Sequence, residues 1–496
     1  MKKITLLFIG IIFSVNGICQ ITFERTFSYS PSNYDSRSFT CQQTSDGNYV
    51  IGSYQPVPPQ ANNIHLIKLD VNGDTIWTRI YDWTYTVCRA IQQTADSGFI
   101  LTGPTSNPGS GGTYLLKTNS IGNVQWVKTY IMATDSYDAY SVRQTNDGGY
   151  ILTGNTDWTT QADMFLLKTD SAGNAQWSKT YGGAFDDWGN CVRQTFDGGY
   201  VMTGALGYDV VIIKVDNSGN VQWTKTFDLG GDERGKGIQQ TPDSGYIVTG
   251  TNDGTYLIKT DVNGNLVWSK TYTPGAGYCV DRTTDGGYVI VNRSPEASLI
   301  KVNATGNFSW AKGYVGNVYS ESFSGEQTND GGYFLSGETQ NATNVTVVYA
   351  IKTDSLGNSG CNNILSLTEI TPATVVTSPS ITGVAVTPIV TVRSVSIIQG
   401  VTPEFLCVEN IGELSSEENS ISLSPNPATN EITVQSLKFK VQSVEIYNTL
   451  GENVYSNAET SETSTETINV RKLSSGIYFV RVKTKEGEKA VKFVKE

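Results

Sequence analysis

The sequence contains almost no histidine and no closely spaced pair of cysteines. One histidine, His65, and seven cysteines occur in 496 residues, and no two cysteines are separated by only two residues. Zinc sites are built from clustered cysteine and histidine side chains, so this composition argues against a zinc centre. We predict no metal ligand set and no cofactor from the sequence.

Long apolar runs and basic charge are also scarce. Lysine and arginine total 35 against 47 aspartates and glutamates, for a formal net charge of -12. This balance argues against nucleic acid or an anionic membrane as a partner. Beyond the N-terminus no run of 18 apolar residues occurs, so no transmembrane segment is predicted.

The first nineteen residues are predicted to be a signal peptide. Lys2 and Lys3 precede an apolar run from Leu6 to Val15, and short residues then lead to Gln20. The mature protein is therefore expected to be exported. In an oxidising compartment, Cys361 and Cys407 are candidates for a loop-closing disulfide, although sequence alone cannot establish the pairing.

Glycine and aromatic residues are abundant, with 50 Gly, 26 Tyr and 9 Trp, which favours a turn-rich all-β protein. One phrase, of the form QTxDGGY, occurs seven times. The spacing of its aspartate ranges from 42 residues (Asp243 to Asp285) to 51 residues (Asp96 to Asp147). The seven aspartates are Asp46, Asp96, Asp147, Asp197, Asp243, Asp285 and Asp330. This period suits the four-stranded blade of a β-propeller.

A second phrase, typified by Leu166 to Tyr181, places two strands around an Asp-x-x-Gly-Asn turn and ends in a WxKTY strand. The seventh copy has Cys361 in place of the tryptophan and lacks that strand. Residues Phe23 to Phe27 fit the missing pattern, so an N-terminal strand is expected to close the last blade. The sequence thus predicts a seven-bladed β-propeller over residues 20–361. The repeated tryptophans are interpreted as blade-to-blade packing.

These repeats resemble the quinoprotein-like and related propeller repeats of large exported Bacteroidetes proteins. The resemblance implies a fold and not an activity, because propellers host binding modules, lyases, hydrolases and scaffolds. No GxSxG motif accompanies His65, which is interpreted as incidental.

Strand alternation separates the turns into two rims. Turns between the first and second strands and between the third and fourth share one uniform rim, and the variable loops share the other. Aromatic and acidic side chains on the variable rim suit a carbohydrate or protein ligand. The candidates are Trp83, Tyr85, Tyr137, Asp138, Trp158, Asp186, Asp187 and Trp188. Because the first four repeats are longer, a pocket is expected on their side of the ring.

Three functions remain open from the residues. The leading hypothesis is a binding or adhesion module without enzymatic activity. The alternative is a secreted polysaccharide-degrading hydrolase or lyase, although adjacent carboxylates such as Asp186 and Asp187 do not show the facing pair that glycoside hydrolysis needs. The third is a structural spacer.

Residues 362–420 are rich in Thr, Val, Ser, Ile and Pro and are predicted to be an extended linker with some β character. Residues 421–496 contain short alternating runs and are predicted to form a small C-terminal β-sandwich. Its motifs include Pro425, Asn426, Pro427, Gly476, Tyr478, Lys489 and Lys492. In these motifs the domain resembles the type A sorting domain of the type IX secretion system. The resemblance implies recognition by the outer-membrane translocon, and release or attachment at the cell surface.

Overall fold

The computed structural model contains strands and no helix among the residues it describes. It describes residues 20–495 apart from 29–34, 58–59, 83–85, 108–109, 132–137, 157–160, 253, 294–295, 316–318, 342, 361, 366, 380, 382–383, 386–388, 394–395, 399–401, 409–420, 425–427, 437–440, 449–452, 458–464, 475 and 485–486. The predicted signal peptide, residues 1–19, lies outside the described residues. No helix in the described part of the chain is long and apolar enough to cross a membrane. The chain forms two compact units, Met1–Val408 and Glu409–Glu496.

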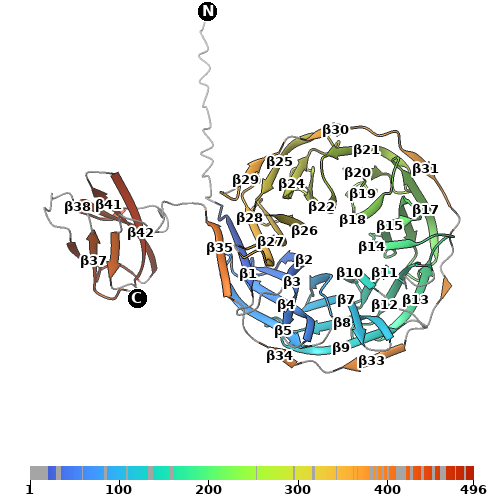
Figure 1. The fold of residues 1–496 in the computed structure, drawn as a ribbon, viewed down its shortest axis with the longest axis horizontal. Helices are drawn as coiled ribbons and strands as arrows, with labels where there is room; N and C mark the ends of the chain where they lie inside the picture. Colours follow the sequence, from blue (N-terminus) through green and yellow to red (C-terminus); the bar gives the residue numbers. More distant parts are fainter. Residues whose placement is uncertain are drawn as a thin grey trace, which may run out of the picture. The chain divides into compact units, whose positions relative to one another are not determined.

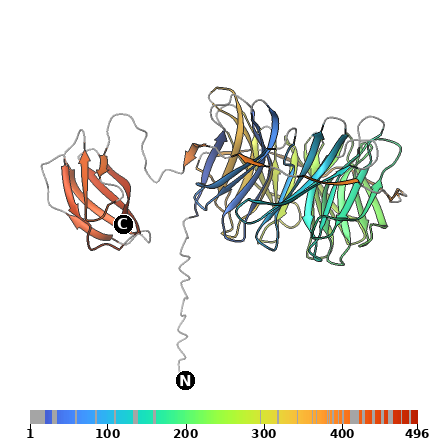
Figure 2. The same cartoon turned by 90° about the horizontal axis from the view of Figure 1, so that it is seen from below.

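The first unit is a β-propeller. Its described residues form seven five-stranded antiparallel sheets arranged around a ring (Figure 1). Figure 2 shows these blades edge-on, with strands running between the two rims. The innermost strands are β2 (Arg37–Gln43), β6 (Ala90–Gln93), β10 (Asp138–Gln144), β14 (Asp187–Gln194), β18 (Arg234–Gln240), β22 (Gly277–Arg282) and β26 (Ser320–Gln327).

Two further strands of each blade follow the innermost one in sequence. The second strands are β3 (Tyr49–Val57), β7 (Phe99–Asn107), β11 (Tyr150–Asn155), β15 (Tyr200–Leu206), β19 (Tyr246–Thr251), β23 (Tyr288–Asn292) and β27 (Tyr333–Gln340). The third strands are β4 (Gln60–Leu69), β8 (Ser110–Thr118), β12 (Met164–Thr169), β16 (Asp209–Val215), β20 (Thr255–Thr260), β24 (Ala297–Val302) and β28 (Thr346–Thr353). Their apolar side chains are buried between neighbouring blades, in clusters that repeat around the ring.

The fourth strands confirm the expected closure of the ring. They are β5 (Thr75–Asp82), β9 (Val124–Ile131), β13 (Ala175–Tyr181), β17 (Val221–Asp228), β21 (Leu266–Thr273), β25 (Phe308–Tyr314) and β1 (Phe23–Ser28). The N-terminal strand β1 pairs with β28, with Arg25 opposite Ala350. Phe23 occupies the tryptophan position and its ring lies 6.0 Å from that of Tyr49 in the next blade. The predicted packing role of the tryptophans is also found, since Trp77 lies 6.0 Å from Phe99 and Trp223 lies 5.7 Å from Tyr246.

A fifth strand on every blade comes from residues 362–408, which were expected to belong to a linker. This segment runs around the outside of the ring and pairs with each outer edge in turn (Figure 1). Its strands are β29 (Asn362–Ile364), β30 (Thr368–Ile370), β31 (Val375–Thr377), β32 (Val384–Ala385), β33 (Ile389–Arg393), β34 (Ser396–Ile398) and β35 (Thr402–Val408). We call these residues the belt.

The physical reason for the belt is the set of unpaired backbone groups on each fourth strand. An exposed sheet edge offers N–H and C=O groups to any extended chain, and a Thr- and Val-rich segment is suited to pair with it. The last belt strand, β35, pairs with β1 itself, with Phe23 opposite Val408. The prediction of a spacer over residues 362–420 is therefore wrong for the belt, and the propeller unit extends to Val408 rather than to residue 361.

The second unit is the small sandwich expected from the sequence. One sheet has the order β36-β37-β40 and the other β39-β38-β41-β42. The strands are β36 (Ile421–Ser424), β37 (Glu431–Ser436), β38 (Val441–Asn448), β39 (Asn453–Asn457), β40 (Thr465–Asn469), β41 (Gly476–Thr484) and β42 (Gly487–Lys495). Side chains of both sheets, including Val434, Ile446 and Val480, share one core.

Candidate ligand-binding site

The uniform rim of the propeller is held by a repeated ion pair. In each blade a buried lysine of the third strand contacts the aspartate of the QTxDGGY turn, as in Lys168 to Asp147 at 2.8 Å. The other pairs are Lys68 with Asp46, Lys117 with Asp96, Lys214 with Asp197, Lys259 with Asp243, Lys301 with Asp285 and Lys352 with Asp330. The same contact in all seven blades marks these residues as structural.

The glutamine that opens the phrase in six of the seven repeats joins the turn of one blade to that of its neighbour. Gln93 accepts a hydrogen bond from the backbone N–H of Ser45 at 2.7 Å, and Gln43 accepts one from Asn329 at 2.8 Å across the seam of the ring. On the uniform rim the ion pairs therefore act within each blade, and the glutamine hydrogen bonds connect neighbouring blades.

The opposite end of the central channel has a different character. A pocket of about 560 Å³ opens among the innermost strands, at the ends that lead into the variable loops. Its size lies within the usual range for small-molecule sites. It is lined by Arg37, Phe39, Tyr54, Asn62, Val87, Arg89, Tyr140, Trp188, Asn190, Arg234, Lys236, Tyr278, Arg293 and Phe323. We call this set the central pocket.

Each of the seven blades contributes one residue from the same repeat position. That position lies four residues before the Gln or Arg that opens the QT phrase. It is occupied by Phe39, Arg89, Tyr140, Asn190, Lys236, Tyr278 and Phe323. In each innermost strand the residue that follows this position is small, and the residue after that is mostly apolar and buried. Because side chains alternate along a strand, the side chain at the variable position is turned toward the channel.

Aromatic rings form one wall of the central pocket. The ring of Phe323 lies 5.3 Å from that of Tyr278 and 5.4 Å from that of Phe39. Such faces pack against the apolar faces of sugar rings and against planar cations. The Arg89 guanidinium lies 4.4 Å from the Phe39 ring centroid and 5.6 Å from that of Tyr140.

Basic side chains form much of the remaining wall, together with Asn62, Val87 and Asn190. Arg234 lies over the Trp188 ring at 5.0 Å, and Lys236 lies 5.7 Å from the ring of Tyr278. The lining holds five basic residues and no carboxylate. This is notable in a chain whose formal net charge is -12.

Three of the five cations already have carboxylate partners. Arg37 pairs with Glu338 at 3.3 Å and Arg234 with Asp232 at 3.4 Å. Arg293 pairs with Glu321. Among the residues that the structure describes, no carboxylate lies within ion-pair distance of Arg89 or Lys236. These two side chains are therefore placed to receive an anionic group from outside.

Burial and neighbouring positive charges shift the titration of Lys236. Loss of hydration, together with the charges of Arg234, Arg89 and Arg293, lowers its pKa to about 8. Asp138, two residues before Tyr140, accepts a hydrogen bond from the Tyr140 hydroxyl at 3.2 Å. Burial raises the pKa of Asp138, and its Oδ1 atom has no hydrogen-bond partner among described residues.

The sequence-predicted rim residues have different locations. Trp188 lines the central pocket, and Asp138 lies beside it. Asp186 is exposed and accepts a hydrogen bond from the backbone N–H of Ala162 at 3.0 Å. The positions Trp83, Tyr85, Tyr137 and Trp158 lie outside the described residues.

Asp187 is fully buried and is not among the residues that line the central pocket. Its carboxylate accepts hydrogen bonds from the backbone N–H groups of Gly183 and Gly207, the latter at 2.8 Å, so it braces two loops. The pocket is also not confined to the first four blades, because Lys236, Tyr278 and Phe323 come from the last three.

Two other sequence expectations are located by the structure. His65 is buried, with its Nδ1 atom 3.0 Å from the Ser53 hydroxyl, and burial lowers its pKa to about 3. The candidate disulfide cannot be placed, because Cys361 and the side chain of Cys407 lie outside the described residues.

In the sandwich, Tyr478 is buried and its hydroxyl donates to the carbonyl of Ser474 at 2.9 Å. Gly476 begins β41, and Lys489 and Lys492 lie on its partner β42, opposite Val482 and Phe479. Residues 425–427 are outside the described part of the chain.

The architecture places the chain among the β-propeller proteins that carry a separate C-terminal β domain. Residues 422–496 match the family of secretion system C-terminal sorting domains. The chain therefore carries a type IX secretion sorting domain at its C-terminus and is exported to the cell surface or beyond as cargo of that system. No curated protein sequence matches the chain.

Several solved structures are similar at low identity. The WD40 β-propeller domain of Doa1 shares 11% identity at a TM-score of 0.45, covering 66% of this chain and 96% of that one. Sqt1 of Chaetomium thermophilum shares 9% at a TM-score of 0.44, covering 70% and 88%. PorZ, a bacterial surface component of the type IX secretion system of Porphyromonas gingivalis, shares 9% at a TM-score of 0.23, covering 92% and 81%. With TM-scores below 0.5, these likenesses carry no functional argument.

Proposed function

We propose that this protein is an exported binding module whose central pocket takes an acidic carbohydrate. The observation that supports it is the pocket of about 560 Å³ in which five basic and six aromatic side chains meet. A uronic or sulfated sugar offers both an apolar ring face and an anionic group, and the pocket wall is complementary to both.

Arg89 and Lys236 are the proposed anion contacts. Arg89 is stacked against Phe39 and its Nε atom has no hydrogen-bond partner among described residues, so its guanidinium is oriented without being neutralised. A guanidinium held in this way binds a carboxylate or sulfate through paired hydrogen bonds. The wall formed by Tyr278 and Phe323 would receive the ring face of the sugar.

Export supplies the setting for this binding. The predicted signal peptide at residues 1–19 would direct the chain to the periplasm, and the sorting domain would engage the type IX translocon. The propeller would then act as an adhesion or capture module at the cell surface or in the medium. An acidic polysaccharide outside the cell is a ligand that such a module can reach.

A calorimetric titration with acidic and neutral oligosaccharides of equal length tests the proposal. We expect measurable binding of oligogalacturonate or a sulfated oligosaccharide and no measurable binding of the neutral form. Lys236→Gln should weaken binding about tenfold, because one charge-assisted contact is lost. Lys179→Gln, which removes the same charge from the outer strand β13, should bind as the unaltered protein does.

Equal affinity of Lys236→Gln and the unaltered protein would refute the assignment of the pocket. Stronger binding of oligoglutamate than of any acidic sugar would identify a protein ligand instead. Salt should weaken the interaction, because the attraction is between charges.

A polysaccharide-degrading enzyme is the second candidate, favoured by one observation. Burial raises the pKa of Asp138 beside the pocket, which is a property of a general acid. Release of reducing ends from an acidic polysaccharide, lost in Asp138→Asn, would support this function. Binding without product release over a broad substrate panel would exclude it.

A further inference from the structure

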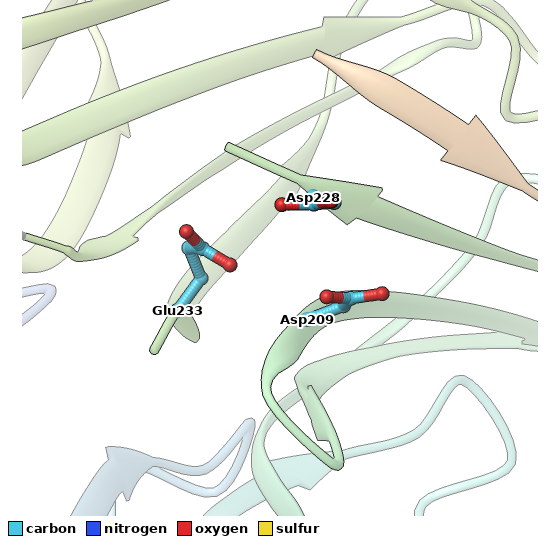
Figure 3. A group of neighbouring side chains, drawn as sticks. All are labelled: Asp209, Asp228 and Glu233. Carbon is cyan, nitrogen blue, oxygen red and sulfur yellow. The ribbon is translucent and has the colours of Figure 1, made fainter. Parts of the chain in front are cut away.

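A group of three carboxylates, none of which lines the central pocket, lies on the variable rim where the fourth blade leads into the fifth. Asp209 begins β16, Asp228 ends β17, and Glu233 lies just before β18. Their carboxylate oxygens lie within 4.8 Å of one another. Figure 3 shows the three groups facing a common space.

The strand register brings two of these charges together. Val210 of β16 is opposite Phe227 of β17, so Asp209 and Asp228 follow as neighbours at the end of the same ladder. Like charges at facing positions of a sheet repel each other. The third carboxylate increases this repulsion, and no ion pair with lysine or arginine relieves it among the residues that the structure describes.

Glu233 is the unusual member of the group. It is fully buried, yet its Oε2 atom has no hydrogen-bond partner among described residues. Its Oε1 atom accepts a hydrogen bond from the Asn252 side chain at 3.0 Å, and its backbone N–H donates to the carbonyl of Tyr208 at 2.8 Å. These contacts hold the carboxylate in place and leave one oxygen directed toward the two aspartates (Figure 3).

In the preceding blade, the carboxylate at the same repeat position has hydrogen-bond partners for both of its oxygens. Asp187 occupies the position of Glu233, seven residues before the QT glutamine, and is also fully buried. Backbone N–H groups of Gly183 and Gly207 bind its two oxygens. The strand end that corresponds to Asp228 is Gly182, so the third carboxylate is missing there.

We propose that Asp209, Asp228 and Glu233 form a binding site for one calcium ion. Three carboxylates supply only oxygen ligands, which suits Ca²⁺ better than zinc or copper. Ca²⁺ accepts irregular geometry and completes its shell with carbonyl oxygens and water, whereas Mg²⁺ demands a regular octahedron. Extracellular calcium modules bind with dissociation constants of about 0.1–1 mM, which is the range expected here.

The ion would connect the start of β16 and the end of β17 with the loop that leads into β18. Glu233 belongs to the loop that leads into β18, and Arg234 of the pocket is its direct neighbour. Occupancy would fix this loop and neutralise the repulsion between the three carboxylates. The site does not depend on the proposed sugar ligand, so either assignment can fail alone.

The test is a calorimetric titration of the chelator-treated full-length protein with Ca²⁺ and, separately, with Mg²⁺. We expect one Ca²⁺ per chain, at least tenfold weaker Mg²⁺ binding, and a melting temperature about 2–4 °C higher in 5 mM Ca²⁺. Glu233→Gln and Asp228→Asn should each lose the Ca²⁺ response. Asp163→Asn is the matched control, because Asp163 occupies the position of Asp209 in the neighbouring blade, and it should respond as the unaltered protein does.

A second measurement separates a metal site from a structural carboxylate. In chelator, Glu233→Gln should melt at or above the temperature of the unaltered protein, because the change removes a repulsive charge. A lower melting temperature in chelator would show that Glu233 stabilises the loop without an ion, and it would overturn the proposal. Absence of Ca²⁺ binding to the unaltered protein, or unchanged binding in both variants, would overturn it as well.

Discussion

The two rims of the propeller use similar residue types for opposite purposes. On the uniform rim each buried lysine has an aspartate of its own blade, as in Lys168 with Asp147 at 2.8 Å. In the central pocket Lys236 has an aromatic neighbour and no carboxylate within ion-pair distance among described residues. Seven equivalent pairs stabilise the scaffold, whereas the half-buried Lys236 ammonium has no such pair and is the cation that the proposed ligand would contact.

The largest effect should come from breaking the scaffold at its seam. Deleting residues 21–28 removes β1 and leaves β28 and β35 without their shared partner. We expect a melting temperature at least 10 °C lower, or loss of soluble protein, since a central strand of one blade is missing. Glu369→Ala is a milder control, because it removes two belt contacts, to Lys270 and to the backbone N–H of Phe308, and should cost about 1–2 kcal/mol. Equal stability of the deletion and the control would contradict the closure of the ring.

A single pair on the uniform rim should affect stability and leave ligand binding unchanged. Asp147→Asn leaves the Lys168 ammonium, whose side chain is 3% exposed, without its carboxylate. Because the hydrogen bonds to Thr169 and Gln176 remain, we expect a loss of about 2 kcal/mol, measured by denaturant unfolding. Lys236→Gln should show the reverse pattern, with weaker sugar binding and stability that is equal or higher. If Asp147→Asn and Lys236→Gln changed stability and sugar affinity in the same way, the two rims would not differ in function.

The smallest effect is a pH dependence of the central pocket. The pKa of Lys236 is lowered to about 8 from an ordinary value of 10.5, so the folded protein holds fewer protons than the unfolded chain between these values. Stability, measured relative to Lys236→Gln, should therefore rise as the pH increases from about 8 to 10. Affinity for an acidic sugar should fall severalfold over the same interval, because the neutral amine no longer attracts the anion. A flat profile for this difference would show that Lys236 stays charged in the pocket.

The repeat could be interpreted from sequence because its signals are local. The QTxDGGY turns and WxKTY strands specify strand, turn and period within a few dozen residues, and Phe23 to Phe27 supplies the one missing strand. The belt had no such signal. The belt strands are between two and seven residues long and have no repeated sequence pattern. Their positions could therefore be predicted only from the unpaired outer edges of the blades, which the sequence does not reveal directly.

The central pocket was missed for a related reason. Sequence reasoning turned to the variable loops, whereas the lining side chains sit at the start of the innermost strands. A signal was present at the position four residues before the QT phrase, which changes from Phe39 to Arg89 to Tyr140 while its neighbours stay small or apolar. Trp188 could be predicted because it directly follows the acidic pair Asp186 and Asp187 of a variable loop.

The pairing of β1 with β35 joins residue 23 to residue 408, almost the whole length of the propeller unit. Because β1 is synthesised first and β35 almost last, this pairing cannot form until nearly the whole propeller unit has been made. Contacts between residues so distant in sequence also form slowly. The sorting-domain match begins at residue 422, and β35 ends at Val408. A product truncated before β35 therefore lacks both the strand that completes the last blade and the sorting domain that export requires.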